Sequence, residues 1–355
     1  MKISVAMCTY NGAAYLQQQL DSIAAQTRQP DELVICDDQS ADDTRKIVET
    51  FASRFPAKTR LYFNEKNLGS TRNFERAINL CEGEIIALAD QDDVWHPEKL
   101  ALMESEFQAA PHVGLVFTDL EVVDEKLLPL GYRAWQCEWV EFTRHEQEFV
   151  KKGRAFDLLL TRNVVTGSAM AFRSKYRHLV APTPEISKWF VHDYWIALLI
   201  AAVSDIAFIE TPLVKYRHYP AQQIGLLPTP KTHPTRRAEA QRHLKSYPIQ
   251  AYLMKLVHER LSAGEHAADY AGAISKLGAA IAHEQARAEL PQKKFTGRAA
   301  WVLKELSALR YHIFRHPHSN VLFDAARDLM PYRVLHLSSY VTNALARQSN
   351  QKGPH

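Results

Sequence analysis

Residues 84–95 read Glu-Ile-Ile-Ala-Leu-Ala-Asp-Gln-Asp-Asp-Val-Trp, an apolar run followed directly by carboxylates. The run predicts a buried strand, so Asp90, Asp92 and Asp93 are expected where that strand ends and a loop begins. Neighbouring carboxylates repel one another unless a cation joins them. Mg²⁺ and Mn²⁺ take oxygen ligands, and Mg²⁺ usually binds through one or two carboxylates plus substrate phosphates. The local pattern fits a metal site and a solvated acidic turn equally well.

Strand and helix patterns alternate upstream and downstream of this stretch, which is typical of an α/β layered fold. Three strands end in polar loops, at Thr9, Asp37 and Asp90. Because parallel sheets bind ligands outside the carboxyl ends of their strands, we expect these loops to converge on one site. The strands are expected at residues 3–8, 32–36, 60–64, 84–88 and 113–118.

Length and composition exclude several classes of protein. The 355 residues allow one large domain or two, and 46% hydrophobic with 23% charged residues is an ordinary globular composition. No stretch reaches the roughly 18 apolar residues of a membrane span, and the first residues lack the layout of a signal peptide. The four cysteines show no metal-ligand spacing, so we expect buried thiols in a reducing cytosol.

Charge is distributed unevenly along the chain. Residues 1–225 hold 24 Lys and Arg against 31 Asp and Glu, whereas residues 226–355 hold 19 against 9. Prolines at 228, 230 and 234 indicate a linker, after which long helical patterns rich in Ala, Lys, Arg and Leu run to about residue 347. A basic helical region attached to an acidic body indicates an anionic partner such as a membrane surface.

Six motifs occur in order at the expected loops, namely Cys8-Thr9-Tyr10-Asn11-Gly12, Asp37-Asp38-Gln39-Ser40-Ala41-Asp42-Asp43-Thr44, Asn67-Leu68-Gly69 with Arg72-Asn73-Phe74, Asp90-Gln91-Asp92-Asp93-Val94-Trp95, Thr166-Gly167 and His192-Asp193-Tyr194-Trp195. Taken together, these motifs resemble the family 2 glycosyltransferases, which have a nucleotide-sugar-binding α/β fold called GT-A. The resemblance covers about residues 1–225 and implies a GT-A catalytic domain with a mostly parallel sheet flanked by helices. Residues 226–355 would form the C-terminal helical extension. The acidic motif and the helix at residues 73–78 are similar to the bacterial rhamnosyltransferase branch.

The resemblance implies a nucleoside-diphospho-sugar donor, linked to dTDP or UDP, at the first strand ends. The backbone at Thr9 and Asn11 is expected to contact the nucleobase and Tyr10 to pack beside it, although a surface aromatic is the alternative for Tyr10. Asp38 is expected to accept hydrogen bonds from the base or ribose, whereas Asp37 is expected to hold the loop, so that one of the pair is structural. Arg72 is expected at the diphosphate, because a guanidinium fits phosphate oxygens, with a surface salt bridge as the alternative.

The acidic motif is expected to carry the sugar-nucleotide and the cation together. By resemblance, Asp90 faces the ribose with Gln91 beside it, while Asp92, together with Asp93, holds Mg²⁺ or Mn²⁺ on the two phosphates. The cation would neutralise the charge that builds on the departing nucleoside diphosphate.

A second segment bears on the metal site. Relatives often carry Tyr-Arg-x-His, whose histidine can reach the metal or the diphosphate, but here the histidine, His218, comes one position early. Neighbouring side chains of an extended segment point in opposite directions. His218 is therefore a candidate third metal contact only if the loop shifts, and Arg217 is the alternative contact to the diphosphate.

Asp193 is the predicted general base. An inverting transfer needs one carboxylate to take the acceptor hydroxyl's proton as the oxygen attacks the anomeric carbon. Semi-apolar neighbours would raise its pKa, and the alternative is that Asp193 only caps the helix that follows. The predicted acceptor-side residues are Thr166, Gly167 and Trp195. The alternative for the Thr166-Gly167 pair is a tight turn, and the alternative for Trp195 is a position in the core.

The resemblance thus implies a metal-dependent inverting glycosyltransferase of bacterial surface polysaccharide or lipopolysaccharide synthesis. The first expected donor is dTDP-L-rhamnose, and the acceptor is a glycan or a lipid-linked glycan. A cytoplasmic location is expected, with peripheral contact at the inner membrane through a basic amphipathic helix at residues 298–316. Alternatively, the apolar stripe of that helix packs on the catalytic domain instead of binding a membrane. Nucleic acid is not an expected partner, because no recognition motif accompanies the charge.

Two other functions fit parts of this sequence. A sugar nucleotidyltransferase would normally show a Gly-rich phosphate loop with a basic residue after the first strand, and residues 8–12 show neither. A non-catalytic scaffold that binds sugar-nucleotides would carry the same loops without turnover.

Overall fold

The computed structural model describes residues 1–55, 58–137, 140–184, 192–220, 222, 226, 251–290 and 293–307. The chain forms two compact units, Met1–Thr229 and Pro230–His355. The expected change of character after residue 225 falls close to this division. Among the described residues, no helix combines the length and apolar character needed to cross a bilayer.

The first half of unit one is a parallel sheet in the order β3-β2-β1-β4. Every residue of β1, β2 and β4 is buried, as expected for strands covered on both faces. The helices between these strands turn an apolar face to the sheet. The elements are β1 (Ile3–Thr9), α1 (Leu16–Ala24), β2 (Glu32–Asp37), α2 (Thr44–Ala52), β3 (Lys58–Phe63), α3 (Ser70–Leu80) and β4 (Ile85–Ala89).

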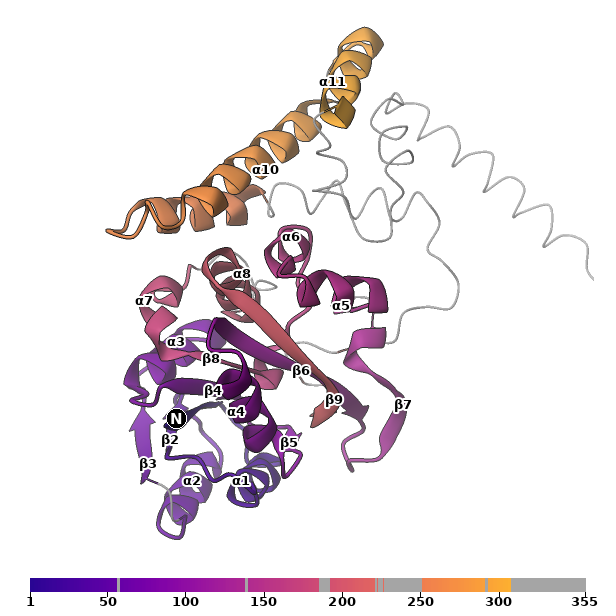
Figure 1. The fold of residues 1–355 in the computed structure, drawn as a ribbon. Coiled ribbons are helices and arrows are strands. Elements are labelled where there is room, and N and C mark those ends of the chain that lie inside the picture. Colours follow the sequence, from indigo (N-terminus) through magenta and orange to yellow (C-terminus); the bar gives the residue numbers. More distant parts are fainter. Residues whose placement is uncertain are drawn as a thin grey trace, which may run out of the picture. The chain divides into compact units, whose positions relative to one another are not determined.

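The second half of unit one makes the sheet mixed (Figure 1). From β4 the order continues β8-β6-β9-β5, and β7 pairs with β6 at the side. β6 and β9 are parallel, whereas β8 runs antiparallel to both β4 and β6. The strands are β5 (Val94–Trp95), β6 (Val113–Val123), β7 (Pro129–Arg133), β8 (Met170–Arg173) and β9 (Asp205–Arg217).

The sheet is mostly parallel as expected, because β1, β2, β3, β4, β6 and β9 run in one direction, whereas β5, β7 and β8 run antiparallel to their neighbours. The antiparallel direction of β8 has a structural consequence, since its register pairs Ala87 with Ala171. The turn that precedes β8 consequently lies at the same edge of the sheet as the carboxyl end of β4.

Helices flank this sheet (Figure 1). The apolar run that begins at Ile196 lies in a helix, α8, in which nearly every residue is buried, so it is a core helix as expected. All four cysteines are buried free thiols. The helices of this half are α4 (Lys99–Ala109), α5 (Arg144–Lys151), α6 (Ala155–Leu159), α7 (Arg177–Val180) and α8 (His192–Val203), with 3₁₀ turns η1 (Ala134–Gln136), η2 (Gly167–Ala169) and η3 (Ser174–Tyr176).

Unit two is helical where it is described, which confirms the expected C-terminal helices. It contains a helical segment at residues 251–262, α10 (Ala271–Glu289) and α11 (Phe295–Ser307). Glu305 of α11 is buried and lies 2.6 Å from His283 Nδ1 of α10, so this face of α11 packs within the unit. The part of the predicted amphipathic helix beyond residue 307 lies outside the described residues.

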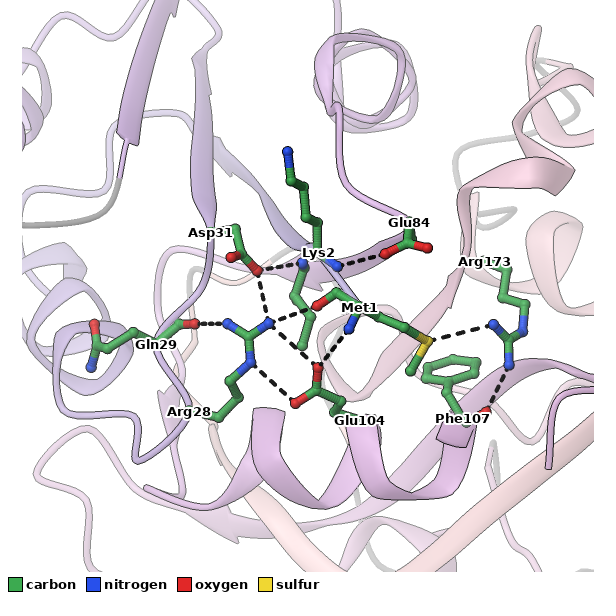
Figure 2. A network of polar contacts seen from close by, with 10 residues as sticks. Met1, Lys2, Arg28, Gln29, Asp31, Glu84, Glu104, Phe107 and Arg173 are labelled. Atoms are coloured by element: carbon green, nitrogen blue, oxygen red, sulfur yellow. Dashed lines mark hydrogen bonds and ion pairs between the residues drawn. The ribbon is translucent and has the colours of Figure 1, made fainter. Parts of the chain in front are cut away.

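A polar network holds the edge of the sheet opposite to the strand carboxyl ends (Figure 2). Arg28 Nε donates to Glu104 Oε2 at 3.1 Å, and Arg28 Nη2 donates to Asp31 Oδ2 at 2.8 Å and to the Met1 carbonyl at 2.7 Å. Asp31 also accepts the Ile3 N–H at 2.8 Å. The network therefore ties α4, which carries Glu104, to the first residues of β1 and the residue before β2.

We expect Arg28→Met to lower the free energy of unfolding by about 1–3 kcal/mol, because the partly buried Glu104 carboxylate loses the guanidinium that pairs with it. The side chains of Arg28 and Glu104 are 25% and 16% exposed. Arg45→Met is the matched control, since the Arg45–Glu49 pair is 62% and 49% exposed. The control should cost less than about 0.5 kcal/mol in urea denaturation. Equal losses would contradict a stabilising role for the network.

Candidate active site

The loops after β1, β2 and β4 lie side by side at one edge of the sheet. The register pairs Met7 with Ala89 and Thr9 with Asp37, so the three strands end at nearly the same level. The expected convergence of these loops is confirmed. The acid loop, residues 90–93, leaves β4 at this edge and leads into β5.

Gln91 joins the acid loop to the loop after β1. Its Oε1 accepts the Tyr10 N–H at 2.8 Å, and its Nε2 donates to the Tyr10 carbonyl at 3.0 Å. A Cβ on Gly12 would come within 2.2 Å of Gln91 Oε1, so the glycine leaves room for this amide. The Tyr10 side chain is 50% exposed. Gln91 thus fixes the backbone of an exposed aromatic, and its own contact with a donor stays a prediction.

Asp37 and Asn11 hold the first two loops together. The Thr9 hydroxyl donates to Asp37 Oδ2 at 2.8 Å, and the Ser40 N–H donates to Asp37 Oδ1 at 2.9 Å. Asn11, at a φ of +46°, accepts the Ala41 N–H at 2.8 Å through Oδ1. Thr9 is buried and Asn11 is exposed. Their predicted contacts with the base stay predictions.

Asp38 organises the third loop. Its Oδ1 accepts hydrogen bonds from Asn64 Nδ2 and the Leu68 N–H, each at 2.7 Å. Its Oδ2 accepts the Gly69 N–H at 2.8 Å, and Gly69 has a φ of +80° that favours glycine. The structure therefore gives the buried Asp38 a loop-holding role, which the sequence analysis assigned to Asp37 of the same pair. A contact with the base or ribose stays a prediction.

The acid loop concentrates negative charge in a desolvated place. Burial raises the pKa of Asp90 to about 7, and the charges of Asp92 and Asp193 add to that rise. Burial also raises the pKa of Asp92, although the Tyr219 hydroxyl opposes the rise by donating to Asp92 Oδ2 at 2.7 Å. Burial and the other two carboxylates raise the pKa of Asp93 well above its ordinary value. Mutually repelling carboxylates such as Asp90 and Asp92 fit a hard divalent cation.

The end of β9 fixes the acid loop from the other side. Arg217 is buried, and its Nε donates to the Asp92 carbonyl at 2.8 Å while its N–H donates to Asp93 Oδ1 at 3.3 Å. Its Nη2 donates to Gln18 Oε1 at 2.6 Å, and the guanidinium lies 4.4 Å from the Tyr15 ring centroid. The alternative role of Arg217 at a diphosphate is therefore wrong, because its donors are used inside the protein.

His218 does not complete a metal site with the two predicted acidic ligands. Among the residues that the structure describes, no three His, Cys, Asp or Glu side chains are grouped closely enough to hold an ion. The reason is the alternation of an extended segment, since Arg217 and Tyr219 both turn to the acid loop and His218 lies between them. The predicted metal role of His218 is thus corrected, whereas the metal contacts of Asp92 and Asp93 stay predictions. Asp92 with Asp90 remains the pair that fits a cation.

Lys99 is a buried residue of this site that the sequence analysis missed. Its Nζ donates to the Ser168 carbonyl at 2.6 Å and lies 3.5 Å from the Trp95 ring centroid. Burial lowers the pKa of Lys99 well below its ordinary value, although Asp93 and Asp90 oppose that shift. The one indication in the sequence was the position of this lysine, four residues after Trp95 of the acidic motif. The surrounding residues predict only an ordinary helix start.

Asp193 lies in the first turn of α8, close to η2. Its Oδ2 accepts the Gly167 N–H at 3.3 Å, and its Oδ1 accepts the Tyr194 N–H at 2.5 Å and Asn163 Nδ2 at 3.4 Å. Burial raises the pKa of Asp193 to about 7, against the lowering effect of the two backbone donors. The expected rise in pKa is confirmed. The charge of Asp193 in turn raises the pKa of Asp90, so the two carboxylates act on each other across the site.

His192 and the predicted acceptor turn surround this carboxylate. The His192 ring stacks on Phe74 with centroids 4.1 Å apart, and burial lowers its pKa to about 3, so the ring is neutral. Within the described part of the chain, the two ring nitrogens of His192 have no hydrogen-bond partner, and the Thr166 hydroxyl has none either. A Cβ on Gly167 would lie 3.1 Å from His192 Nε2. The acceptor role of Thr166 and Gly167 stays a prediction.

Two other predicted contact residues have partners inside the protein. Trp195 is 1% exposed and its Nε1 donates to the Val180 carbonyl at 2.8 Å, so it belongs to the core and offers no face to an acceptor sugar. This corrects its predicted acceptor role, because α8 turns Trp195 inward. Arg72 Nη1 lies 2.9 Å from Glu75 Oε2, which is the salt bridge foreseen as its alternative. Its diphosphate contact stays a prediction.

Residues 4–179 match the family model described as glycosyl transferase family 2. This part of the chain is therefore similar to the family 2 glycosyltransferases. An uncharacterised glycosyltransferase of Nostoc sp. is 37% identical over 124 residues, which are 35% of this chain and 38% of that protein. An uncharacterised protein of Mycobacterium bovis is 26% identical over 227 residues, which are 61% of this chain and 59% of that protein. The chain thus spans less than two thirds of the length of these relatives.

A solved structure supports the fold of the glycosyltransferase domain. The crystal structure of S. aureus TarS 1–349 in complex with UDP-GlcNAc matches with a TM-score of 0.50 and 16% identity. The match covers 85% of this chain and 79% of that one. Together with the family model it confirms the expected GT-A fold. The rhamnosyltransferase branch is not singled out by these matches.

We expect Asp193→Asn to stabilise the protein at about pH 8 and not at about pH 4, as measured by urea denaturation. The folded-state pKa is about 7, above the ordinary value of 3.8. Such a carboxyl stabilises the fold fully below its ordinary pKa and loses that contribution as the pH rises through its folded value. Removing the charge should therefore add about 1–3 kcal/mol to the free energy of unfolding at the higher pH. A neutral or destabilising effect at both pH values would contradict the burial of this carboxylate.

Proposed function

We propose that the chain is an inverting glycosyltransferase that moves a sugar from a nucleoside-diphospho-sugar to a glycan or lipid-linked acceptor in bacterial surface polysaccharide synthesis. The observation that carries the proposal is the relation between Asp193 and the acid loop. A buried carboxylate with a pKa of about 7 stands within electrostatic reach of Asp90 at the end of β4. The family 2 domain at residues 4–179 supports the same reaction class.

Asp193 is assigned the proton transfer. As the acceptor oxygen bonds to the anomeric carbon, the bond from that carbon to the phosphate oxygen breaks and Asp193 takes the hydroxyl proton. A pKa near 7 suits a base that must be ionised at physiological pH and still bind a proton. The N–H groups of Gly167 and Tyr194 hold the carboxylate in one orientation.

The donor is assigned to the loops after β1 and β4. The exposed Tyr10 ring would pack beside the nucleobase, since Gln91 fixes its backbone. Asp90 would face the ribose, and Asp92 together with Asp90 would hold Mg²⁺ or Mn²⁺. When bound, that cation offsets the charge of the leaving nucleoside diphosphate. The UDP-GlcNAc named for the TarS structure supports a UDP- or dTDP-linked donor, and L-rhamnose is the first candidate sugar from the resemblance of the acidic motif.

A peripheral position at the cytoplasmic face of the inner membrane is part of the proposal. Phe295 and Leu303 of α11 are large apolar side chains exposed to solvent. Lys293, Lys294 and Lys304 are exposed near them. Apolar and basic side chains on a helix and directly before it suit an anionic bilayer surface.

The base assignment predicts a loss of turnover without a loss of binding. Asp193→Asn should lower kcat for transfer by about 10²–10⁴-fold, while calorimetry shows unchanged affinity for the nucleoside diphosphate. The transfer rate of the wild type should rise as the pH increases through about 7, since the base must lose its proton. Asp157→Asn, a buried carboxylate of α6 paired with Arg154, is the control and should keep its transfer rate. Near-normal transfer by folded Asp193→Asn would exclude this base.

The cation assignment predicts that a chelator lowers transfer by at least about 10-fold and that Mn²⁺ restores it. The assay follows the loss of intact nucleotide-sugar across a panel of dTDP-, UDP- and GDP-sugars, which also identifies the donor. Undiminished transfer by the chelated protein would contradict the assignment. Nucleotide binding without turnover of any donor would favour the scaffold, whereas formation of a nucleotide-sugar from a sugar phosphate would favour the nucleotidyltransferase.

A further inference from the structure

Lys99 joins two parts of the site that are far apart in the sequence. It is the first residue of α4 and is fully buried. Its Nζ donates to the Ser168 carbonyl at 2.6 Å, and this carbonyl lies in the middle of η2. Buried lysines are rare in proteins unless they have a specific partner. Here the hydrogen-bond partner is the main chain of a short turn.

The same turn holds Asp193. The Gly167 N–H donates to Asp193 Oδ2 at 3.3 Å, one residue from the carbonyl that Lys99 binds. The antiparallel register of β8 against β4 pairs Ala87 with Ala171, which puts η2 next to the end of β4. A continuous path therefore runs from α4 through η2 to the carboxylate of Asp193.

Two physical roles are open to a buried lysine at this place. It can offset the charges of Asp93 and Asp90, which act on it electrostatically. It can also fix the turn through a directed hydrogen bond, which is what the 2.6 Å contact to Ser168 provides. The first role depends on charge alone, whereas the second depends on a donor at the end of the side chain. The two roles thus predict different outcomes for uncharged replacements.

We propose that Lys99 is a positioning residue, which fixes η2 by its hydrogen bond to Ser168 and thereby holds Asp193 in its working orientation. This inference rests on the proposed function, in which Asp193 is the base. Lys99 itself touches neither donor nor acceptor in this account. Its contribution therefore appears in the transfer step and not in nucleotide binding, because the nucleotide is assigned to the loops after β1 and β4.

The test compares Lys99→Gln with Lys99→Met. Both replacements have side chains one atom shorter than lysine and both remove the charge, but only glutamine keeps an N–H donor. We expect kcat for transfer to fall about 10- to 100-fold in Lys99→Met and less than about 5-fold in Lys99→Gln. Affinity for UDP with Mn²⁺, measured by calorimetry, should stay within about 3-fold of wild type in both.

Equal losses of kcat in the two variants would overturn the inference, because charge alone would then explain Lys99. A parallel fall of kcat and of nucleotide affinity in Lys99→Met would also overturn it, since a general structural role moves both. Met103→Ala is the control for general damage. Met103 is a buried residue of α4, and no hydrogen bond in the described part of the chain joins it to η2. The control should lower the melting temperature while leaving kcat per folded molecule unchanged.

Amide hydrogen exchange gives a second readout that is independent of activity. In Lys99→Met the peptide that contains the Gly167 N–H should exchange about 10-fold faster than in wild type, while Lys99→Gln and Met103→Ala keep the wild-type rate. If Lys99→Met does not fold, wild-type protection of this peptide in Lys99→Gln supports the inference and its loss overturns it. Absence of transfer by the wild type with every donor would instead refute the proposed function, and the exchange comparison still decides whether Lys99 fixes the turn.

Discussion

The repulsion among three carboxylates behind β4 is the constraint on which the rest of the site depends. Burial and mutual charge raise the pKa values of Asp90, Asp92 and Asp93 together. The second half of the fold supplies the groups that hold this loop in place, namely Arg217 on its backbone and Tyr219 on Asp92. The site is thus a place where the protein concentrates negative charge that a divalent cation can balance.

The antiparallel β8 brings the predicted base to the same place. Because β8 runs against β4, the turn before it lies at the edge of the sheet where the acid loop begins. The Gly167 N–H of that turn donates to Asp193, and Lys99 donates to the Ser168 carbonyl of the same turn. A first half built from parallel strands and a second half built around β8 therefore meet at one edge of the sheet, where Asp90 and Asp193 lie.

Much of this arrangement follows from local sequence patterns, and some does not. Apolar runs that end in acids predicted the strand ends, and the neighbours of Asp193 predicted its raised pKa. The direction of β8 was not predictable, since long-range pairing has no local periodicity. Alternation showed that Arg217 and His218 point to opposite sides but not which side faces the acids. The sequence likewise could not show which side of α8 faces the core, so it could not show that Trp195 is buried. Lys99 at the start of a helix gave no indication that it binds the Ser168 carbonyl.

The most direct test of the central claim is calorimetric titration of UDP with Mn²⁺ at about pH 6.5, in buffers of different ionisation enthalpy. Asp90 has a pKa of about 7 and that of Asp92 is raised, so a cation that binds them must displace protons. The account predicts release of up to about one proton for each nucleotide bound with Mn²⁺, and much weaker binding in Asp92→Asn. Binding of the same affinity without Mn²⁺ and without proton release would contradict it.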